Sequence, residues 1–487
     1  MNRLRKLCRS AGLTTPVLLL VTGCMVGPNY KRPSAPAPPA FKGVPPPPAS
    51  AGVAWKQAGE DVGRVPPEWW KIYKDPTLDR IEAQVAQSNQ SLKAAAYQAY
   101  VRSRDQIRIE RSALFPTIGV SSGASRNRAS AHRPFVIPSS RNDYGDLTLQ
   151  GQASWEPDLW GRIRRTVESA RASAQASAAD LANVQLSLQA EAAIDYFQLR
   201  ALDAQESLLS QTVVDYQKAV DLTTLRFQHG LSSDADLALA QTQLDQTKAQ
   251  ASDVGVARAQ YEDALATLTG TPASTFALAG SPLLFTPPAV PAALPSQLLE
   301  RRPDISAAER RIASANAQIG VAQAAFYPTL NLGSASGFES VSPGSWLTGP
   351  STVWTLGMSA AETIFDGGRR RAVKSQAIAD YEQSTAQYRQ TVLTAFQEVE
   401  DNLAALRTLQ VEFGQQAAAV KDAERSMSIS NALYTRGLAN YIQVVTVQTT
   451  LLANQRTAVD INARQATASV QLFKALGGGW TTAQLPH

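Results

Sequence analysis

The chain has 487 residues, a formal net charge of +5 and two cysteines. Four positive charges lie within the first nine residues, so the remainder carries about +1, and a nucleic-acid partner is not indicated. The three histidines, His132, His229 and His487, do not stand at ligand spacing with one another or with a cysteine. The composition therefore predicts no metal centre and no catalytic site.

Residues 1–23 are predicted to be a signal peptide. A basic start precedes the short apolar run Leu13–Val21, and Gly23 offers a small-residue cleavage site before Cys24. The stretch resembles the lipobox of bacterial lipoproteins, which implies a covalent lipid such as palmitate on Cys24. An ordinary signal peptide followed by a chance cysteine is the alternative. No later run reaches eighteen apolar residues, so no transmembrane helix is expected.

Residues 24–68 are rich in proline and predict an extended segment that leads from the lipid to the folded body. The first repeat, 69–270, opens with a pair of tryptophans. Its first helix is predicted to run from Pro76 to about Ala113, where a proline follows.

Two strands and two helices complete the first repeat. Alternating apolar and polar residues predict a weak strand at Thr117–Ser125 and a clear strand at Leu147–Trp155. Heptad spacing then predicts a very long helix over 163–228 and, after a turn, a shorter helix that ends near Leu268.

The same order of elements returns in a second repeat, 298–479. A proline-rich connector, 271–297, precedes it and a short tail, 480–487, follows it. Gln106–Val120 reads against Gln318–Leu332 at an offset of 212, which indicates an internal duplication. The predicted elements are a helix at 303–326, strands around 330–332 and 354–360, a long helix at 369–436 and a shorter one to about 476.

Each long helix is predicted to end at a matching turn. Gly230-Leu231 and Gly437-Leu438 correspond at an offset of 207, with glycine where a left-handed helix cap is needed. These two glycines are the predicted tips of the helical hairpins.

Four strands cannot close a membrane barrel, because such barrels have at least eight strands and open edges are not tolerated in lipid. The sequence therefore predicts an oligomer that shares one outer-membrane barrel. Helices of roughly 66 residues would each span about 100 Å, which indicates a periplasmic tube. A structural periplasmic lipoprotein scaffold with accessory hairpins is the alternative.

Five motifs carry a resemblance that covers nearly the whole mature chain. They are WWKIYKDPTLDRIEAQVAQSNQSLKAAA, WEPDLWGRIRR, LLERRPDISAAERRIASANAQIGVAQAAFYPTLNL, IFDGGRRR and YTRGLANYIQV. With them the chain resembles the outer-membrane factor family of TolC-like channels, in the lipoprotein branch of RND-type multidrug efflux systems. The resemblance implies an α+β membrane protein: a homotrimer with a shared 12-stranded outer-membrane β-barrel and a 12-helix periplasmic α-barrel.

The resemblance also implies a periplasmic gate at the helix turns. Asp236 and Tyr434 match a carboxylate and a tyrosine that constrain the closed tips in the family, and a phenol–carboxylate bond would suit this role. Arg436, Asp234 and Asn440 are further gate candidates, although the family's usual arginine position is Ala439 here. Core packing is the alternative for Tyr434, and helix capping is the alternative for both aspartates.

The sequence thus predicts a passive, non-enzymatic exit duct for drugs or other small molecules. The partners implied are a periplasmic adaptor (membrane fusion) protein, an inner-membrane RND transporter and outer-membrane lipid, with no nucleic acid and no cofactor besides the lipid on Cys24. A duct for type I protein secretion is a second alternative.

Overall fold

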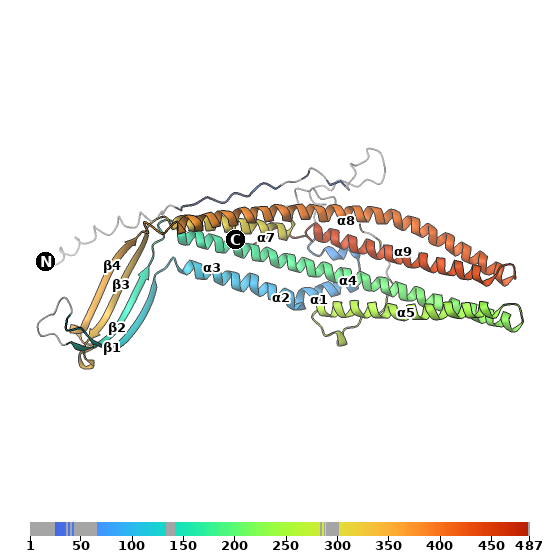
Figure 1. The fold of residues 1–487 in the computed structure, drawn as a ribbon, viewed down its shortest axis with the longest axis horizontal. Helices are drawn as coiled ribbons and strands as arrows, with labels where there is room; N and C mark the ends of the chain where they lie inside the picture. Colours follow the sequence, from blue (N-terminus) through green and yellow to red (C-terminus); the bar gives the residue numbers. More distant parts are fainter. Residues whose placement is uncertain are drawn as a thin grey trace, which may run out of the picture. The chain divides into compact units, whose positions relative to one another are not determined.

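The computed structural model describes residues 25–35, 38, 41–42, 66–132, 142–282, 285–286, 288 and 301–485, and Figure 1 shows its helices and strands. The chain divides into two compact units. Unit 1 is Met1–Ser34, Ala99–Ser177 and Ala308–Tyr388, and unit 2 is Ala35–Gln98, Ala178–Ala307 and Arg389–His487. Each unit takes residues from both repeats. Cys24 lies outside the described residues.

The predicted long helices and their shorter followers are confirmed. Helix α4 (Arg162–Gln228) and helix α8 (Arg369–Thr435) have 67 residues each. Helices α5 (Asp234–Leu268) and α9 (Tyr441–Ala475) have 35 residues each. Helix α7 (Pro303–Ala324) begins at the expected proline, which fits the first turn because its missing N–H is not needed there. No helix among the described residues combines the length and the apolar character needed to cross a membrane.

The first predicted helix is interrupted, so the prediction of one continuous helix is wrong. It consists of α1 (Pro76–Ser88), α2 (Gln90–Ala96), a π-helical segment (Tyr97–Arg102) and α3 (Ser103–Ser112). Asn89 has an extended backbone and ends α1, and its side chain accepts a hydrogen bond from the Leu92 N–H at 2.9 Å. The Asn89 side chain also donates to the Leu268 carbonyl at 2.9 Å. A helix cap and a tertiary contact therefore compete with helix continuation at this residue.

All four predicted strands are present in unit 1. They are β1 (Thr117–Arg128), β2 (Asp143–Trp155), β3 (Thr329–Ser340) and β4 (Thr352–Ala361), and they form one antiparallel sheet in the order β1-β2-β3-β4. The two hairpins of the two repeats therefore lie next to each other (Figure 1). Strands β1 and β4 have no further partner strand among the described residues.

The register of the sheet places apolar side chains on one face. Val120 pairs with Gly151, Leu149 with Phe338, and Leu332 with Met358. Since side chains alternate between faces, Ile118, Leu147 and Leu356 lie on this same face. The opposite face carries mostly threonine, serine, glutamine and glycine.

The segment that follows Cys24 is bound to the helices of unit 1. Arg165 on α4 is almost fully buried and donates hydrogen bonds to the carbonyls of Val26 and Gly27, each at 3.2 Å, and to the Asn29 side chain at 3.0 Å. Gly27 has a φ of +96°, and a Cβ on it would lie 2.4 Å from the Cα of Gly320. Only glycine fits this close contact.

In unit 2, the motif RRPD joins three helices. Arg302 forms ion pairs with Asp304 at 2.7 Å and with Glu398 of α8 at 2.6 Å. It also donates to the carbonyl of Ala475, the last residue of α9, at 3.1 Å. A cation at a helix C-terminus is favoured by the helix dipole, so Arg302 both pairs and caps.

Candidate functional site

The two interhelical turns are built in the same way, one in each repeat. The N–H of Leu231 donates to the Arg226 carbonyl at 2.8 Å, and the N–H of Leu438 donates to the Leu433 carbonyl at 2.9 Å. Gly230 and Gly437 have φ values of +70° and +75°. This is the glycine-terminated helix ending predicted from the sequence, and the offset of 207 holds for the backbone hydrogen bonds that end each long helix.

Asp236 takes part in the cap of helix α5. Ser233 is the N-cap residue: its hydroxyl accepts from the Asp236 N–H, and the Asp236 carboxylate accepts from the Ser233 N–H, both at 3.1 Å. The carboxylate also accepts from the Ser232 hydroxyl at 3.0 Å. Burial raises the pKa of Asp236, but the hydrogen bonds from Ser233 and Ser232 and the charge of Arg226 outweigh it and bring the pKa below its ordinary value. Asp236 is therefore an anion at neutral pH.

The other turn is capped by Asn440, whose side chain accepts from the Gln443 N–H at 3.4 Å. Asp234 is the first residue of α5, where a negative charge is favoured by the helix dipole. Arg436 is exposed, and its N–H donates to the Ala432 carbonyl at 3.4 Å.

Tyr434 is buried and lies against the first helical hairpin, which consists of α4 and α5. Its hydroxyl is 3.3 Å from that of Thr223. The guanidinium of Arg226 lies 4.7 Å from the centre of the Tyr434 ring and donates to the Tyr434 carbonyl at 3.1 Å. Arg226 on α4 thus holds α8 through a cation–π contact and a hydrogen bond.

Within the described part of this chain, no hydrogen bond joins Asp236 to Tyr434; both interact with Arg226 instead. Sequence reasoning missed Arg226, which lies some 208 positions before Tyr434 in the chain. Its one sequence signal is its place in the last turn of a long helix, where a basic residue is favoured.

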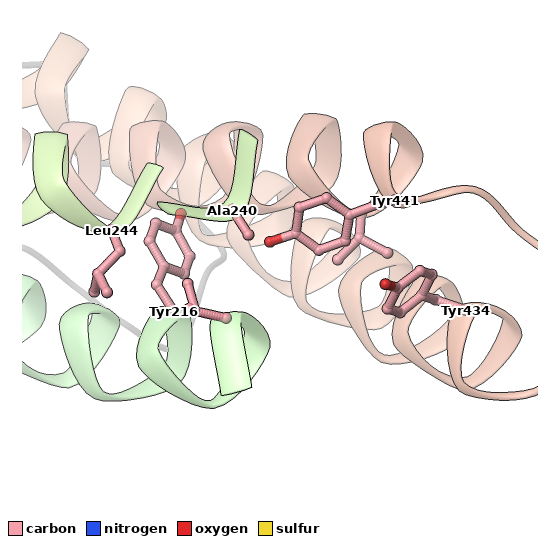
Figure 2. Close-up of a cluster of buried hydrophobic side chains, with 7 residues drawn as sticks. Tyr216, Ala240, Leu244, Tyr434 and Tyr441 are labelled. Carbon is pink, nitrogen blue, oxygen red and sulfur yellow. The ribbon is translucent and has the colours of Figure 1, made fainter. Parts of the chain in front are cut away.

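A cluster of buried side chains lies beside the turns. This turn-proximal cluster comprises Tyr216 and Val220 of α4, Ala240 and Leu244 of α5, and Tyr434, Tyr441 and Val444 of the second hairpin. Figure 2 shows Tyr434 and Tyr441 side by side, with Tyr216 and Leu244 on the facing hairpin. The two rings are 5.4 Å apart, and burial, followed by the neighbouring Tyr434, Tyr216 and Asp236, raises the pKa of Tyr441 to about 12.

A groove of about 570 Å³ adjoins the cluster. Apart from tyrosines, the only ionisable side chains that line it among the described residues are Asp215 and Lys218, which pair with each other at 2.9 Å. The groove thus offers packing and hydrogen bonding, and its one carboxylate–ammonium pair among the described residues is already engaged with itself. Nor does the described part of the chain contain a group of three or more metal-ligating side chains.

A sequence model of the family described as outer membrane efflux protein matches residues 83–271 and 294–478. The chain belongs to this family. The match falls once in each repeat. This outer membrane efflux protein is a transport component and not an enzyme.

Named relatives and solved structures agree. The chain is 30% identical over 478 residues to the solvent efflux pump outer membrane protein SrpC of Pseudomonas putida, covering 96% of this chain and 98% of SrpC. It is 32% identical over 421 residues to the pyoverdine export outer membrane protein OpmQ of Pseudomonas aeruginosa, covering 85% of this chain and 87% of OpmQ.

The fold is that of outer-membrane channels. The structure is similar to the outer-membrane channel OprN, with a TM-score of 0.85, 26% identity and coverage of 94% of this chain and 100% of OprN. It is also similar to the open state of the Neisseria gonorrhoeae MtrE channel, with a TM-score of 0.81, 26% identity and coverage of 94% and 99%. This protein is therefore an outer-membrane channel of the TolC-like, α+β type that serves efflux.

Proposed function

We propose that three copies of this chain form the exit duct of a tripartite efflux system for drugs or other small molecules. The observation that carries the proposal is the four-stranded sheet with one apolar face and two edges, β1 and β4, that lack partners in the described chain. Unpaired strand edges are not tolerated in hydrocarbon. Pairing β1 of one copy with β4 of the next in a closed trimer removes every edge and gives twelve strands.

The proposed duct is held to the outer membrane by a lipid on Cys24. The segment that begins at Met25 supports this anchor, because Val26 and Gly27 are already bound to Arg165 on α4. A lipid attached at Cys24 would therefore be tethered within two residues of the folded body.

The proposed partners are a periplasmic adaptor protein and an inner-membrane RND transporter, which the names of the efflux-pump relatives support. The duct transduces no energy itself. Its helix turns would form the periplasmic gate, and the contact of Arg226 with Tyr434 would hold the two hairpins of a copy together in the closed state. Docking of the adaptor would separate them.

A planar-bilayer recording of the purified trimer tests the duct and its gate. We expect a low conductance for the unmodified protein and a higher one for Arg226→Ala and for the double variant Asp236→Ala/Tyr434→Ala. Loss of one charge-assisted contact of about 1.5–3 kcal/mol should raise the open fraction roughly 10- to 100-fold. Arg425→Ala, which removes an exposed arginine of α8, should leave the conductance unchanged.

Other outcomes would contradict the proposal at different points. A trimer without conductance, even in the gate variants, would indicate a structural scaffold. A monomer in every detergent would rule out the shared sheet. Restored secretion of a protein substrate, without restored drug resistance in a strain that lacks its own channel, would indicate a protein-secretion duct.

A further inference from the structure

A second pocket, of about 570 Å³, lies in unit 1 among α3, α4, α7 and the segment after Cys24. Arg111 of α3 and Arg164 and Arg171 of α4 line it, together with Arg310 of α7. Met25, Leu114 and Val167 form apolar parts of its wall. The pocket therefore combines guanidinium groups with apolar surface.

Its acidic neighbours are already engaged by other arginines. Asp158 pairs with Arg164 at 3.1 Å, and Glu168, which also lines the pocket, pairs with Arg165 at 2.8 Å. Glu309 forms two hydrogen bonds with Arg310.

Two arginines are left over. The guanidinium groups of Arg111 and Arg171 have no ion pair or hydrogen bond with any residue that the structure describes, and both side chains are exposed. The pocket thus has an excess of positive charge on two groups whose planar fork fits a phosphate.

Aromatic side chains place this pocket beside one end of the sheet. Leu114, in its wall, accepts a hydrogen bond at 3.0 Å from the indole of Trp155, the last residue of β2. Trp160 stacks on Tyr327 at 4.8 Å where α4 and β3 begin, and Phe115 is 60% exposed. Tryptophan and tyrosine gather at membrane–water interfaces, so this end of the sheet fits the depth of lipid headgroups.

We propose that this pocket binds the phosphate group of an anionic phospholipid in the periplasmic leaflet, with Arg111 and Arg171 as its ligands. Leu114 and Val167 would contact the glycerol and the first acyl carbons. Basic pockets between helices at the membrane surface bind such headgroups. The inference rests on the proposed orientation of the sheet in the outer membrane.

Native mass spectrometry of the full-length protein in detergent tests the inference, with phosphatidylglycerol and phosphatidylcholine as probes. We expect the unmodified protein to prefer phosphatidylglycerol. Arg111→Gln and Arg171→Gln should each weaken that binding about fivefold, and the double variant roughly 25-fold. Lysine at either position should restore part of the preference, because it keeps the charge but not the fork. Arg425→Gln is the matched control and should bind as the unmodified protein does.

The outcomes separate the sources of the phosphate. Full competition by millimolar inorganic phosphate would show that the pocket takes free phosphate and would overturn the lipid assignment. Equal binding of the two lipids by the unmodified protein would also overturn it. Equal binding of phosphatidylglycerol by the double variant and by the unmodified protein would overturn it too. Dissociation of the oligomer in the double variant would instead assign the two arginines to ion pairs between copies.

A parallel bilayer recording distinguishes this inference from the duct itself. A conducting channel without lipid preference would overturn the pocket alone, whereas lipid preference in a non-conducting protein would overturn the duct alone.

Discussion

Glu82 on α1 is fully buried in unit 2, and both of its carboxylate oxygens lack a hydrogen-bond partner among the described residues. Burial, and secondarily the nearby Asp79, raises the pKa of Glu82 well above its ordinary value. The folded protein therefore binds a proton here that the unfolded chain releases at lower pH. Stability must fall as the pH rises from the ordinary pKa through the raised one, and it is constant above.

The variant Glu82→Gln should remove this pH dependence, because the amide stays neutral at every pH. We expect its unfolding temperature to exceed that of the unmodified protein by about 2–4 °C at pH 8.5 and to converge with it below pH 5. Thermal unfolding followed by circular dichroism across this range measures the difference. Glu424→Gln, an exposed glutamate on α8, should leave the profile unchanged. Parallel curves for Glu82→Gln and its parent would contradict the prediction.

Arg302 shows what a single buried cation does at the start of the second repeat. Replacing it by alanine removes its ion pairs with Asp304 and Glu398 and uncaps the carbonyl of Ala475. We expect a loss of about 2–4 kcal/mol, since the partners stay behind partly buried. Arg302→Lys should lose less, because it keeps a charge near Glu398 but not the fork on Asp304. Urea denaturation checks the order, and equal losses for both variants would contradict it.

At the scale of elements, the turn after each long helix depends on its glycine. Gly437 has a φ of +75°, and a Cβ there would meet nothing within 4 Å, so any cost of substitution comes from the backbone alone. An L-residue in this conformation costs about 1–2 kcal/mol. Gly414 lies inside α8 and is equally open, but its backbone is helical.

The substitutions Gly437→Ala and Gly414→Ala should therefore have opposite effects on local stability: the first should lower it and the second should raise it. Hydrogen exchange of the Leu438 amide, which donates to the Leu433 carbonyl, should become roughly 5- to 30-fold faster in Gly437→Ala. Amides around Gly414 should exchange more slowly in Gly414→Ala, because alanine is favoured over glycine in a helix interior by about 0.5–1 kcal/mol. Faster exchange in both variants would show that side-chain contacts, and not the backbone angle φ, determine the effect of each substitution on local stability.

The elements that sequence reasoning predicted well are those with long local periods. The heptads of α4 and α8 extend far enough to predict the type of each helix and its ends to within one residue. The alternation in β2 predicted the type and the C-terminal end of the strand, but β2 begins at Asp143, before the predicted Leu147. The break at Asn89 was not predicted, because a single asparagine in a helical pattern does not by itself end a helix. Here the break is stabilised by the hydrogen bond from the Asn89 side chain to the distant Leu268 carbonyl. Local pattern cannot carry such a tertiary contact.

The turn site was predictable only in part, for the same reason. The repeat offset located Gly230 and Gly437, because backbone conformation is encoded locally. The partner of Tyr434 was not predicted, because Arg226 lies on the other helical hairpin and is distant from Tyr434 in the sequence. The repeats also differ here: Phe227, which corresponds to Tyr434 in the first repeat, is 41% exposed, whereas Tyr434 is 6% exposed.

In the whole molecule, the difference in exposure between Phe227 and Tyr434 shows that the two helical hairpins of this duplicated chain are not equivalent. The first hairpin supplies the cation, Arg226, and the second supplies the buried ring, Tyr434. Each copy in a trimer would therefore contain two kinds of hairpin, and three such contacts would act in parallel. If the three contacts had to break together, the proposed gate would respond to an adaptor in an all-or-none way.

The two faces of the sheet predict which of them contacts the membrane lipid. Along β4, Leu356 lies on the apolar face and is 76% exposed, while Thr355 lies on the opposite face and lines a groove together with Gln152 and Asn331. The two positions are neighbours in one strand, so they share backbone environment and depth. They differ only in the face on which the side chain lies.

Arginine at these two positions should therefore separate lipid from water. In the proposed barrel, Leu356→Arg would place a charge against hydrocarbon and should cost about 2–4 kcal/mol near the middle of the membrane, whereas Thr355→Arg would face the water-filled interior and should cost little. Heat-modifiable migration of the oligomer from outer-membrane fractions measures the ratio of folded to unfolded protein, which should fall at least tenfold for Leu356→Arg alone, because each ~1.4 kcal/mol is one factor of ten. The reverse order would mean that the apolar face is turned inward, and equal tolerance of both variants would mean that the sheet does not lie in the membrane at all.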